Sequence, residues 1–420
     1  MSARIAPGLA VILSFVIAGA ICACAALAYA EMATMIPASG SAYTYSYAVL
    51  GEVIAWVIGW SLILEYSLVV STVAVGWSGY AAPLLTPYGF PVELTNGPAL
   101  GGLVNLPAVF IIAVVAGLLM FGTRESATLN AILVVVKMIA LAVFVAIALP
   151  HFQRFATLSR SCLMASPSTR AIDGVERGVM AAAAIIFFAF YGFDAISTAA
   201  EETRNPGRDL AIGIVGSMVA CVAIYMLVAV AAVGALSFTR FADSPEPLAL
   251  ILREIGRPGF ATFLAVSAVI ALPTVLLGFL FGQSRIFFVM ARDGLLPAGL
   301  AKVSRRGAPV RITALTAVLV AIIAGVMPLD AIAALANAGT LAAFVAVCVC
   351  MLVMRRRAPD APRTFRTPLA PVVGTIGVLG CIYLFFSLPH RTQEYFLLWN
   401  VIGLLVYFTY GRRRANAGMT

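Results

Sequence analysis

The chain has 420 residues, of which 62% are hydrophobic and only 11% are charged. This composition excludes an ordinary soluble protein, because soluble domains carry about twice this share of charged residues. The net charge of +9 does not indicate a nucleic-acid surface, since the arginines lie mostly in loops between apolar segments. Apolar runs of roughly 18 residues or more recur along the whole chain, which predicts an integral membrane protein.

Hydropathy and helix-breaking residues predict about eleven membrane-spanning helices, at roughly 20 residues for each crossing. In chain order the predicted spans are 8–36, 51–81, 103–122, 129–149, 178–203, 209–236, 259–290, 310–327, 329–354, 368–388 and 395–411. The loops between them are too short to form separate domains. The sequence therefore predicts one all-α membrane unit over residues 1–420.

Charge placement in the loops predicts the orientation of the chain. If the C-terminus is cytoplasmic, alternation puts most basic loop residues inside, including Arg355–Arg357 and Arg412–Arg414. An odd number of spans then leaves the N-terminus outside. We expect a multi-pass protein of a bacterial plasma membrane with a cytoplasmic C-terminus. The sequence indicates no oligomeric state.

Cysteine and histidine placement argues against an enzyme. Six of the seven cysteines lie within apolar spans without metal-ligand spacing, and both histidines, His151 and His390, lie in predicted loops. A nucleophile–base pair or a ligand cluster would be needed for hydrolytic or metal chemistry. The sequence therefore predicts no catalytic residue, no metal and no cofactor.

Among the charged residues that fall within predicted spans, Glu65, Lys137, Asp194 and Arg285 are the candidates for function, because a charge inside the membrane is costly. Arg285 lies near the end of its span, where a long side chain can reach the interface. Lys137 is one of only two lysines in the chain, and an ammonium, unlike a guanidinium, can release its proton. Lys137 is therefore a candidate for a proton-linked step. Glu65 fits three roles: the partner of Lys137, a contact for a substrate side chain, or a structural acceptor.

Residues 185–206 form an apolar helix with an interruption at Gly192 and Asp194. A break inside a membrane frees backbone N–H and C=O groups, which is tolerated only where they face protein, a water-filled cavity or a ligand. The break predicts a binding site for a small solute at mid-membrane depth. Asp194 is a second candidate there, although it fits equally well as a cap for the freed backbone.

Several segments resemble the amino acid–polyamine–organocation (APC) superfamily, in its cationic amino acid transporter branch. They are YAEMATMIPASGSAYTYSYAVLGEVIAWVIGWSLILEY (29–66), FFAFYGFDAISTAAEETRNPGRDL (187–210), GQSRIFFVMARDGLLP (282–297) and NAGTLAAF (337–344). The resemblance extends over essentially the whole chain and its motifs are specific.

The resemblance implies a LeuT-type fold with inverted repeats whose broken helices meet at the midplane. Residues 8–149 would be an incomplete first repeat, 178–354 the second, and 368–411 two additional helices. In this family, carbonyls of the interrupted helix receive the substrate amino group. The matching residues here are Phe188, Ala189, Phe190 and Tyr191, followed by Gly192 at the break.

Two further positions take their meaning from the resemblance. Lys137 matches a lysine that occupies the place where sodium-coupled relatives bind an ion, which implies proton coupling. Tyr191 stands where family members commonly have an aliphatic residue, which allows a smaller or more polar pocket.

The N-terminal region departs from the family pattern. Family members begin with a Gly-rich broken helix, whereas Pro7–Phe15 here resembles the start of the family's second helix. We therefore expect twelve helices minus the first. Either the start codon is placed too late or the gene is shortened.

From the residues and the resemblance together, we expect an amino acid permease that works by alternating access and is coupled to protons. Its partners would be an amino acid, protons and the lipid bilayer, and no nucleic acid. The alternative is a truncated, non-transporting remnant or an amino acid sensor built on a transporter fold.

Overall fold

The computed structural model describes residues 9–121, 126–151, 178–190, 192–236, 240, 244, 246–297, 299 and 309–411. Every regular element in these ranges is helical. The helices are α2 (Leu9–Met35), α3 (Ala42–Leu50), α4 (Glu52–Leu85), α5 (Leu106–Phe121), α6 (Ser126–Ala148), α7 (Val179–Ile186), α8 (Phe193–Thr198), α9 (Pro206–Ala235), α11 (Pro247–Glu254), α12 (Pro258–Ala271), α13 (Pro273–Arg292), α14 (Val310–Val326), α15 (Leu329–Arg357), α16 (Ala370–Phe386) and α17 (His390–Val406).

Each of the eleven predicted spans falls on one helix or on two consecutive ones. Seven helical segments are long and apolar enough to cross a membrane, α5 and α14 are shorter apolar helices, and α16 and α17 form a pair bent by 111°. The predicted span 259–290 is α12 followed by α13, with Pro273 beginning the second helix. The all-helical membrane class is thereby confirmed.

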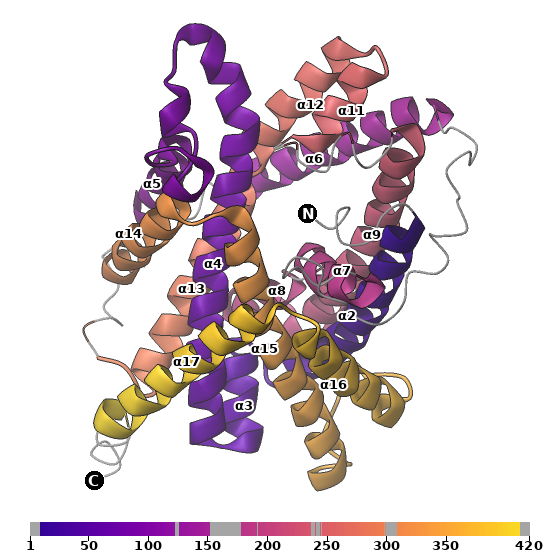
Figure 1. Cartoon of the computed structure of the whole chain (residues 1–420). Helices are drawn as coiled ribbons and strands as arrows, with labels where there is room; N and C mark the ends of the chain where they lie inside the picture. Colours follow the sequence, from indigo (N-terminus) through magenta and orange to yellow (C-terminus); the bar gives the residue numbers. More distant parts are fainter. Residues whose placement is uncertain are drawn as a thin grey trace.

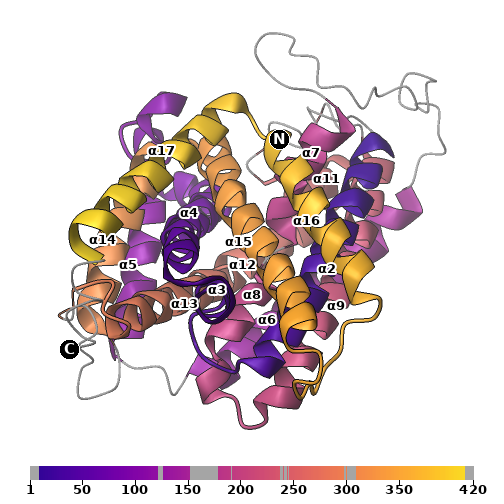
Figure 2. The same cartoon turned by 90° about the horizontal axis from the view of Figure 1, so that it is seen from below.

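Helices α4 and α15 occupy the centre of the bundle (Figures 1 and 2). They pack closely because Gly339 of α15 lies against Glu65 of α4. A methyl group at Gly339 would lie 3.0 Å from the Cβ of Glu65 and 3.1 Å from the carbonyl oxygen of Ser61. Small residues allow such close approach between membrane helices.

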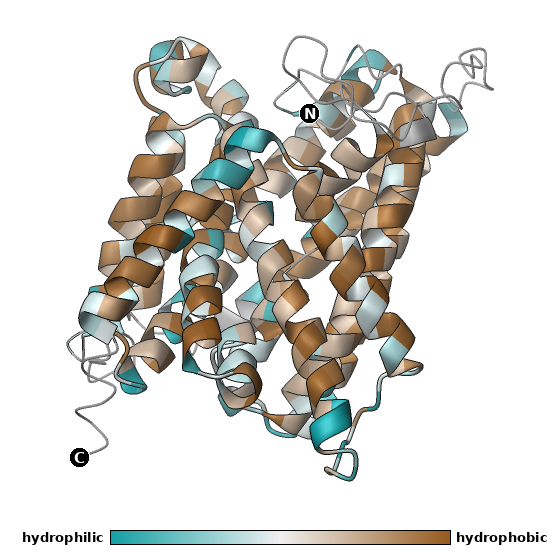
Figure 3. Ribbon diagram, turned by 60° about the horizontal axis from the view of Figure 1, so that its bottom comes forward, coloured by the Kyte–Doolittle hydropathy of each residue, from teal (hydrophilic) through white to brown (hydrophobic). Residues whose placement is uncertain are grey.

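The outer helices carry the apolar surface expected to face lipid. Long aliphatic and aromatic side chains are exposed along α6, α9, α14, α16 and α17, among them Ile132, Val219, Ile322, Leu379 and Leu405. Figure 3 shows hydrophobic residues over most of the length of the helices, with hydrophilic ones mainly near their ends and in loops. This distribution is expected of helices that are surrounded by the hydrocarbon of a lipid bilayer.

Helix α17 is fixed to α4 by a pair of tryptophans. The indole N–H of Trp60 donates to the Trp399 carbonyl at 2.8 Å, and the indole N–H of Trp399 donates to the Trp60 carbonyl at 2.9 Å. Their rings stack at 4.7 Å. Gly403 permits this approach, because a methyl group there would lie 2.4 Å from the Trp60 ring.

Candidate functional site

The predicted interruption is present as a three-part helix. Helix α7 ends at Ile186, a 3₁₀ turn covers Phe187–Ala189, and the short α8 begins at Phe193. Gly192 has φ +117°, a conformation that favours glycine because L side chains rarely adopt it. Tyr191, one of the predicted substrate contacts, lies outside the described residues.

The side chains of the turn show how it is held in the bundle. Phe188 and Ala189 are half-buried, whereas Phe190 is buried. The Phe190 ring lies edge-on to Phe15 of α2 at 5.8 Å and to Tyr225 of α9 at 5.5 Å. Its backbone N–H donates to the Phe187 carbonyl at 3.0 Å. The Phe190 ring therefore packs into the core, and within the described turn over residues 187–190 the polar groups are those of the backbone.

Asp194 joins the break to the central helix α4. One carboxylate oxygen accepts the Tyr66 hydroxyl at 2.9 Å, and the other accepts the Gly192 N–H at 2.9 Å. The side chain is only 1% exposed. Asp194 thus binds the freed backbone at the break and is also held by a neighbouring helix, which compensates part of the cost of its burial.

Helix α15 contacts the end of α7 through Asn337. The amide nitrogen of Asn337 lies 2.8 Å from the Ala184 carbonyl oxygen and 3.3 Å from that of Ile185, so it donates to both. Two helical turns later, the Phe344 ring contacts Phe187 at 5.6 Å and Phe193 at 5.2 Å, on the two sides of the break. One face of α15 therefore supports the whole interruption.

Glu65 lies beside this arrangement in the core. It is completely buried, and neither carboxylate oxygen has a hydrogen-bond partner among the described residues. Asp194 and Thr340 are its polar neighbours. A buried carboxylate without donors is costly, so this position is suited to a proton or to a cationic group that enters the site.

Lys137 and Glu65 do not form a pair. The ammonium of Lys137, on the half-exposed helix α6, donates to the Thr274 hydroxyl at 2.7 Å. Thr274 lies in the first turn of α13. It directly follows Pro273, the residue at which α13 begins after the end of α12. Lys137 therefore connects an outer helix to a helix junction. Arg285, on α13, places its guanidinium 4.9 Å from the centre of the Phe281 ring.

Sequence reasoning missed Tyr66, Asn337 and Gln283 as members of the site. Gln283 of α13 donates to the Ser67 hydroxyl at 2.5 Å, and its amide oxygen has no partner among the described residues. All three are polar residues inside apolar spans, and all three belong to the quoted family motifs. An uncharged polar residue at mid-span was the signal that could have identified them.

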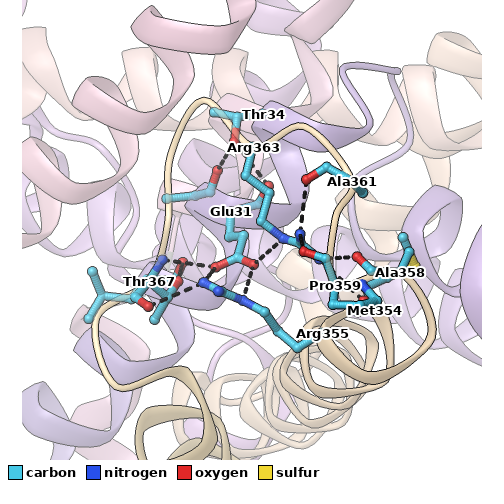
Figure 4. A network of polar contacts seen from close by, with 11 residues as sticks. Glu31, Thr34, Met354, Arg355, Ala358, Pro359, Ala361, Arg363 and Thr367 are labelled. Atoms are coloured by element: carbon cyan, nitrogen blue, oxygen red, sulfur yellow. Dashed lines mark hydrogen bonds and ion pairs between the residues drawn. The ribbon is translucent and has the colours of Figure 1, made fainter.

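A second buried polar cluster lies where α2 and α15 end, and Figure 4 shows Glu31 enclosed by Arg355, Arg363 and Thr367. Arg355 donates to both Glu31 oxygens at 2.7 Å, and Arg363 donates to one of them at 3.1 Å. The Thr367 backbone N–H adds a fourth bond at 2.8 Å. The cluster ties the end of α2 to the loop between α15 and α16.

Further polar contacts lie at the same end of the bundle, around α3 and the end of α13. Tyr43 donates to Asp293, which directly follows α13, at 2.8 Å. The backbone N–H of Ser39 donates to Glu201 at 3.1 Å, and Arg292 lies 3.8 Å from the same carboxylate. Glu201 and Arg292, which belong to the family-like segments 187–210 and 282–297, thus lie close together here.

A cavity of about 710 Å³ opens at the opposite end of the bundle. Its walls come from the last turns of α4, the loop over residues 86–105 and Leu329 at the start of α15, and they are largely apolar. None of its lining residues belongs to the interrupted helix. We therefore place the polar candidate site at the break and not in this cavity.

Comparison with known proteins agrees with this architecture. Residues 2–408 match the family model described as amino acid permease. The chain is 41% identical to the branched-chain amino acid permease BcaP of Bacillus subtilis, over 98% of this chain and 87% of that protein. It is 36% identical to the methylthioribose transporter of the same organism, over 97% and 87% of the two chains.

A plant relative matches over a smaller share of both chains. The vacuolar cationic amino acid transporter 4 of Arabidopsis thaliana is 38% identical over 85% of this chain and 59% of its own. These relatives are permeases and transporters, not enzymes. The chain is a multi-pass integral membrane protein that belongs to the amino acid permease family of the APC superfamily.

Proposed function

We propose that this protein carries amino acids across the membrane by alternating access and is driven by protons. The observation that supports this most directly is the interruption between α7 and α8, which lies in the core beside an unpartnered buried carboxylate. An amino acid carries an ammonium group that needs acceptors, and exposed carbonyls and carboxylates supply them.

In this proposal the fold is of the LeuT type, with residues 8–149 as an incomplete first repeat and residues 178–354 as the inverted second repeat. Backbone carbonyls of Phe188, Ala189 and Tyr191 bind the substrate ammonium. Lys137 is the proton-linked group, since its ammonium has one neutral hydroxyl partner at 2.7 Å and can lose its proton. Glu65 and Asp194 are secondary candidates for the same step.

The substrate class stays open between branched-chain, small neutral and cationic amino acids. The relatives named above are a branched-chain amino acid permease, a cationic amino acid transporter and a methylthioribose transporter. A substrate panel must therefore contain branched-chain, small neutral and cationic amino acids.

The experiment is uptake by the full chain reconstituted into liposomes, with an inward proton gradient and labelled substrates from this panel. We expect accumulation of at least one amino acid and its loss when a protonophore collapses the gradient. Lys137→Ala should remove gradient-driven accumulation while leaving the protein folded, as judged by its elution profile and melting temperature.

Two results would contradict the proposal. If no amino acid enters, the protein is not an amino acid carrier, and binding without flux would favour a sensor. If Lys137→Ala accumulates substrate at the wild-type rate with the same proton dependence, Lys137 has no part in coupling.

A further inference from the structure

Helix α7 ends inside the bundle, and the last carbonyl groups of a helix need partners beyond its regular hydrogen bonds. The Phe187 N–H donates to the Ala183 and Ile185 carbonyls. The next two carbonyls, of Ala184 and Ile185, accept from the amide nitrogen of Asn337, at 2.8 and 3.3 Å. Asn337 is 153 residues away in the sequence and completely buried.

An asparagine amide has two N–H donors, and here both are directed to α7. The amide plane is thereby fixed, and so is the position of its oxygen. That oxygen is buried and has no hydrogen-bond partner among the described residues. A buried amide oxygen without a donor costs free energy, so such an atom in a native core calls for an explanation.

The helices next to the break carry further acceptors without partners. Helix α7 presents carbonyls, Glu65 of α4, which lies against Gly339 of α15, presents a carboxylate without a hydrogen-bond partner among the described residues, and Gln283 of α13 also has an unpartnered amide oxygen. The unpartnered hydroxyl of Tyr29, whose ring contacts Phe193 and Phe344, can accept as well as donate. A group that satisfies several acceptors at once must bring several N–H donors and preferably a positive charge. A primary ammonium has three such donors.

We propose that the Asn337 side-chain oxygen is a direct ligand of the substrate ammonium, and that its nitrogen positions the end of α7 for the same purpose. This assignment rests on the proposed amino acid transport. The two halves of one amide thus have different tasks: the donors hold α7, and the acceptor meets the substrate. Because α15 also contacts Phe187 and Phe193 through Phe344, the ligand and its support come from one rigid helix.

The test compares two competitors of labelled uptake: an amino acid and its 2-hydroxy acid analogue, which has the same side chain and carboxylate but no ammonium. The ratio of their half-inhibitory concentrations measures recognition of the ammonium. In Asn337→Ala we expect the preference for the amino acid to fall about tenfold or more, the effect of one charge-assisted hydrogen bond.

Asn337→Asp separates the two tasks, because it retains an acceptor and removes both donors. We expect it to retain the preference for the amino acid and to lower the melting temperature, since a carboxylate then faces two carbonyls. Asn400→Ala is the matched control. Asn400 also lies in an apolar helix, where it bonds Phe396 and Ser61, and its substitution should leave the preference unchanged.

The outcomes are distinct. An unchanged preference in folded, transporting Asn337→Ala overturns the ligand role while amino acid transport stands. An equal loss of preference in Asn337→Ala and Asn337→Asp assigns Asn337 to holding α7 alone and also overturns it. Wild-type protein that takes up no amino acid overturns the transport proposal and this inference together. If Asn337→Ala does not fold, Asn337→Leu, of similar volume, is measured in its place.

Discussion

The hydroxyl of Tyr66 donates to Asp194 at 2.9 Å, and both side chains are almost fully buried. The other oxygen of Asp194 is already bound to the Gly192 N–H. Removing the hydroxyl therefore takes the side-chain donor away from a buried carboxylate and leaves it only backbone N–H groups. The cost of such a loss is about 1–3 kcal/mol, and more when the acceptor is charged.

We expect Tyr66→Phe to lower the stability of the protein by about 2 kcal/mol and to reduce its melting temperature in detergent. Tyr383→Phe is the control, because Tyr383 is 51% exposed on the outer face of α16 and should change stability by less than about 0.5 kcal/mol. Equal melting temperatures for wild type and Tyr66→Phe would show that this bond does not stabilise the break.

At the level of helices, the sequence predicts what depends on local pattern. Long apolar runs locate the spans, and Gly192 with Asp194 locates the interruption, because a positive φ and a buried charge are both unusual inside a membrane helix. The hydrogen-bond partners of polar residues on distant helices could not be predicted. Asn337 meets Ala184 across 153 residues, and Glu31 meets Arg355 across 324. Such contacts depend on which helix faces pack together, and hydropathy does not encode this.

The Glu31 cluster is the clearest polar link between helices that the sequence did not reveal. The side chains of Glu31 and Arg363 are 1% and 0% exposed, and that of Arg355 is 27% exposed. Arg363 also donates to the carbonyls of Met354 and Ala358, at the end of α15. One carboxylate therefore compensates the positive charge of two guanidinium groups, in surroundings that largely exclude water.

We predict that Glu31→Gln destabilises the protein by about 3–5 kcal/mol, because it leaves buried positive charge without compensation. The control is Glu254→Gln. Glu254 pairs with Arg240 at 2.7 Å, but their side chains are 34% and 60% exposed, so the loss should stay below about 1 kcal/mol. Melting curves in the same detergent compare the two variants. A similar small shift in both would mean that burial does not strengthen the Glu31 cluster.

The whole molecule has two chemically different ends. At one end lie the last turns of α2, α13 and α15, with Arg355–Arg357, and the end of the described chain. Tyr407 donates there to Glu52, at the start of α4, at 2.7 Å, and Gly411 lies beside Leu295. At the other end the Asn105 N–H donates to Gly325 at 3.0 Å, and the loop over residues 86–105 holds no basic residue. From the positive-inside rule we expect the first end to lie in the cytoplasm.

This orientation predicts which loops a membrane-impermeant thiol reagent can reach in intact bacterial cells. In a background without native cysteines, Tyr88→Cys should react in intact cells, since Tyr88 is 89% exposed in the loop over residues 86–105, which holds no basic residue. Asp360→Cys, in the exposed loop after Arg355–Arg357, should react only after the membrane is permeabilised. Equal labelling of both sites in permeabilised cells is the control for accessibility of the thiols. The reverse pattern in intact cells would place the arginine-rich end outside, against the charge rule, and labelling of both sites would mean that they do not lie on opposite sides of the membrane.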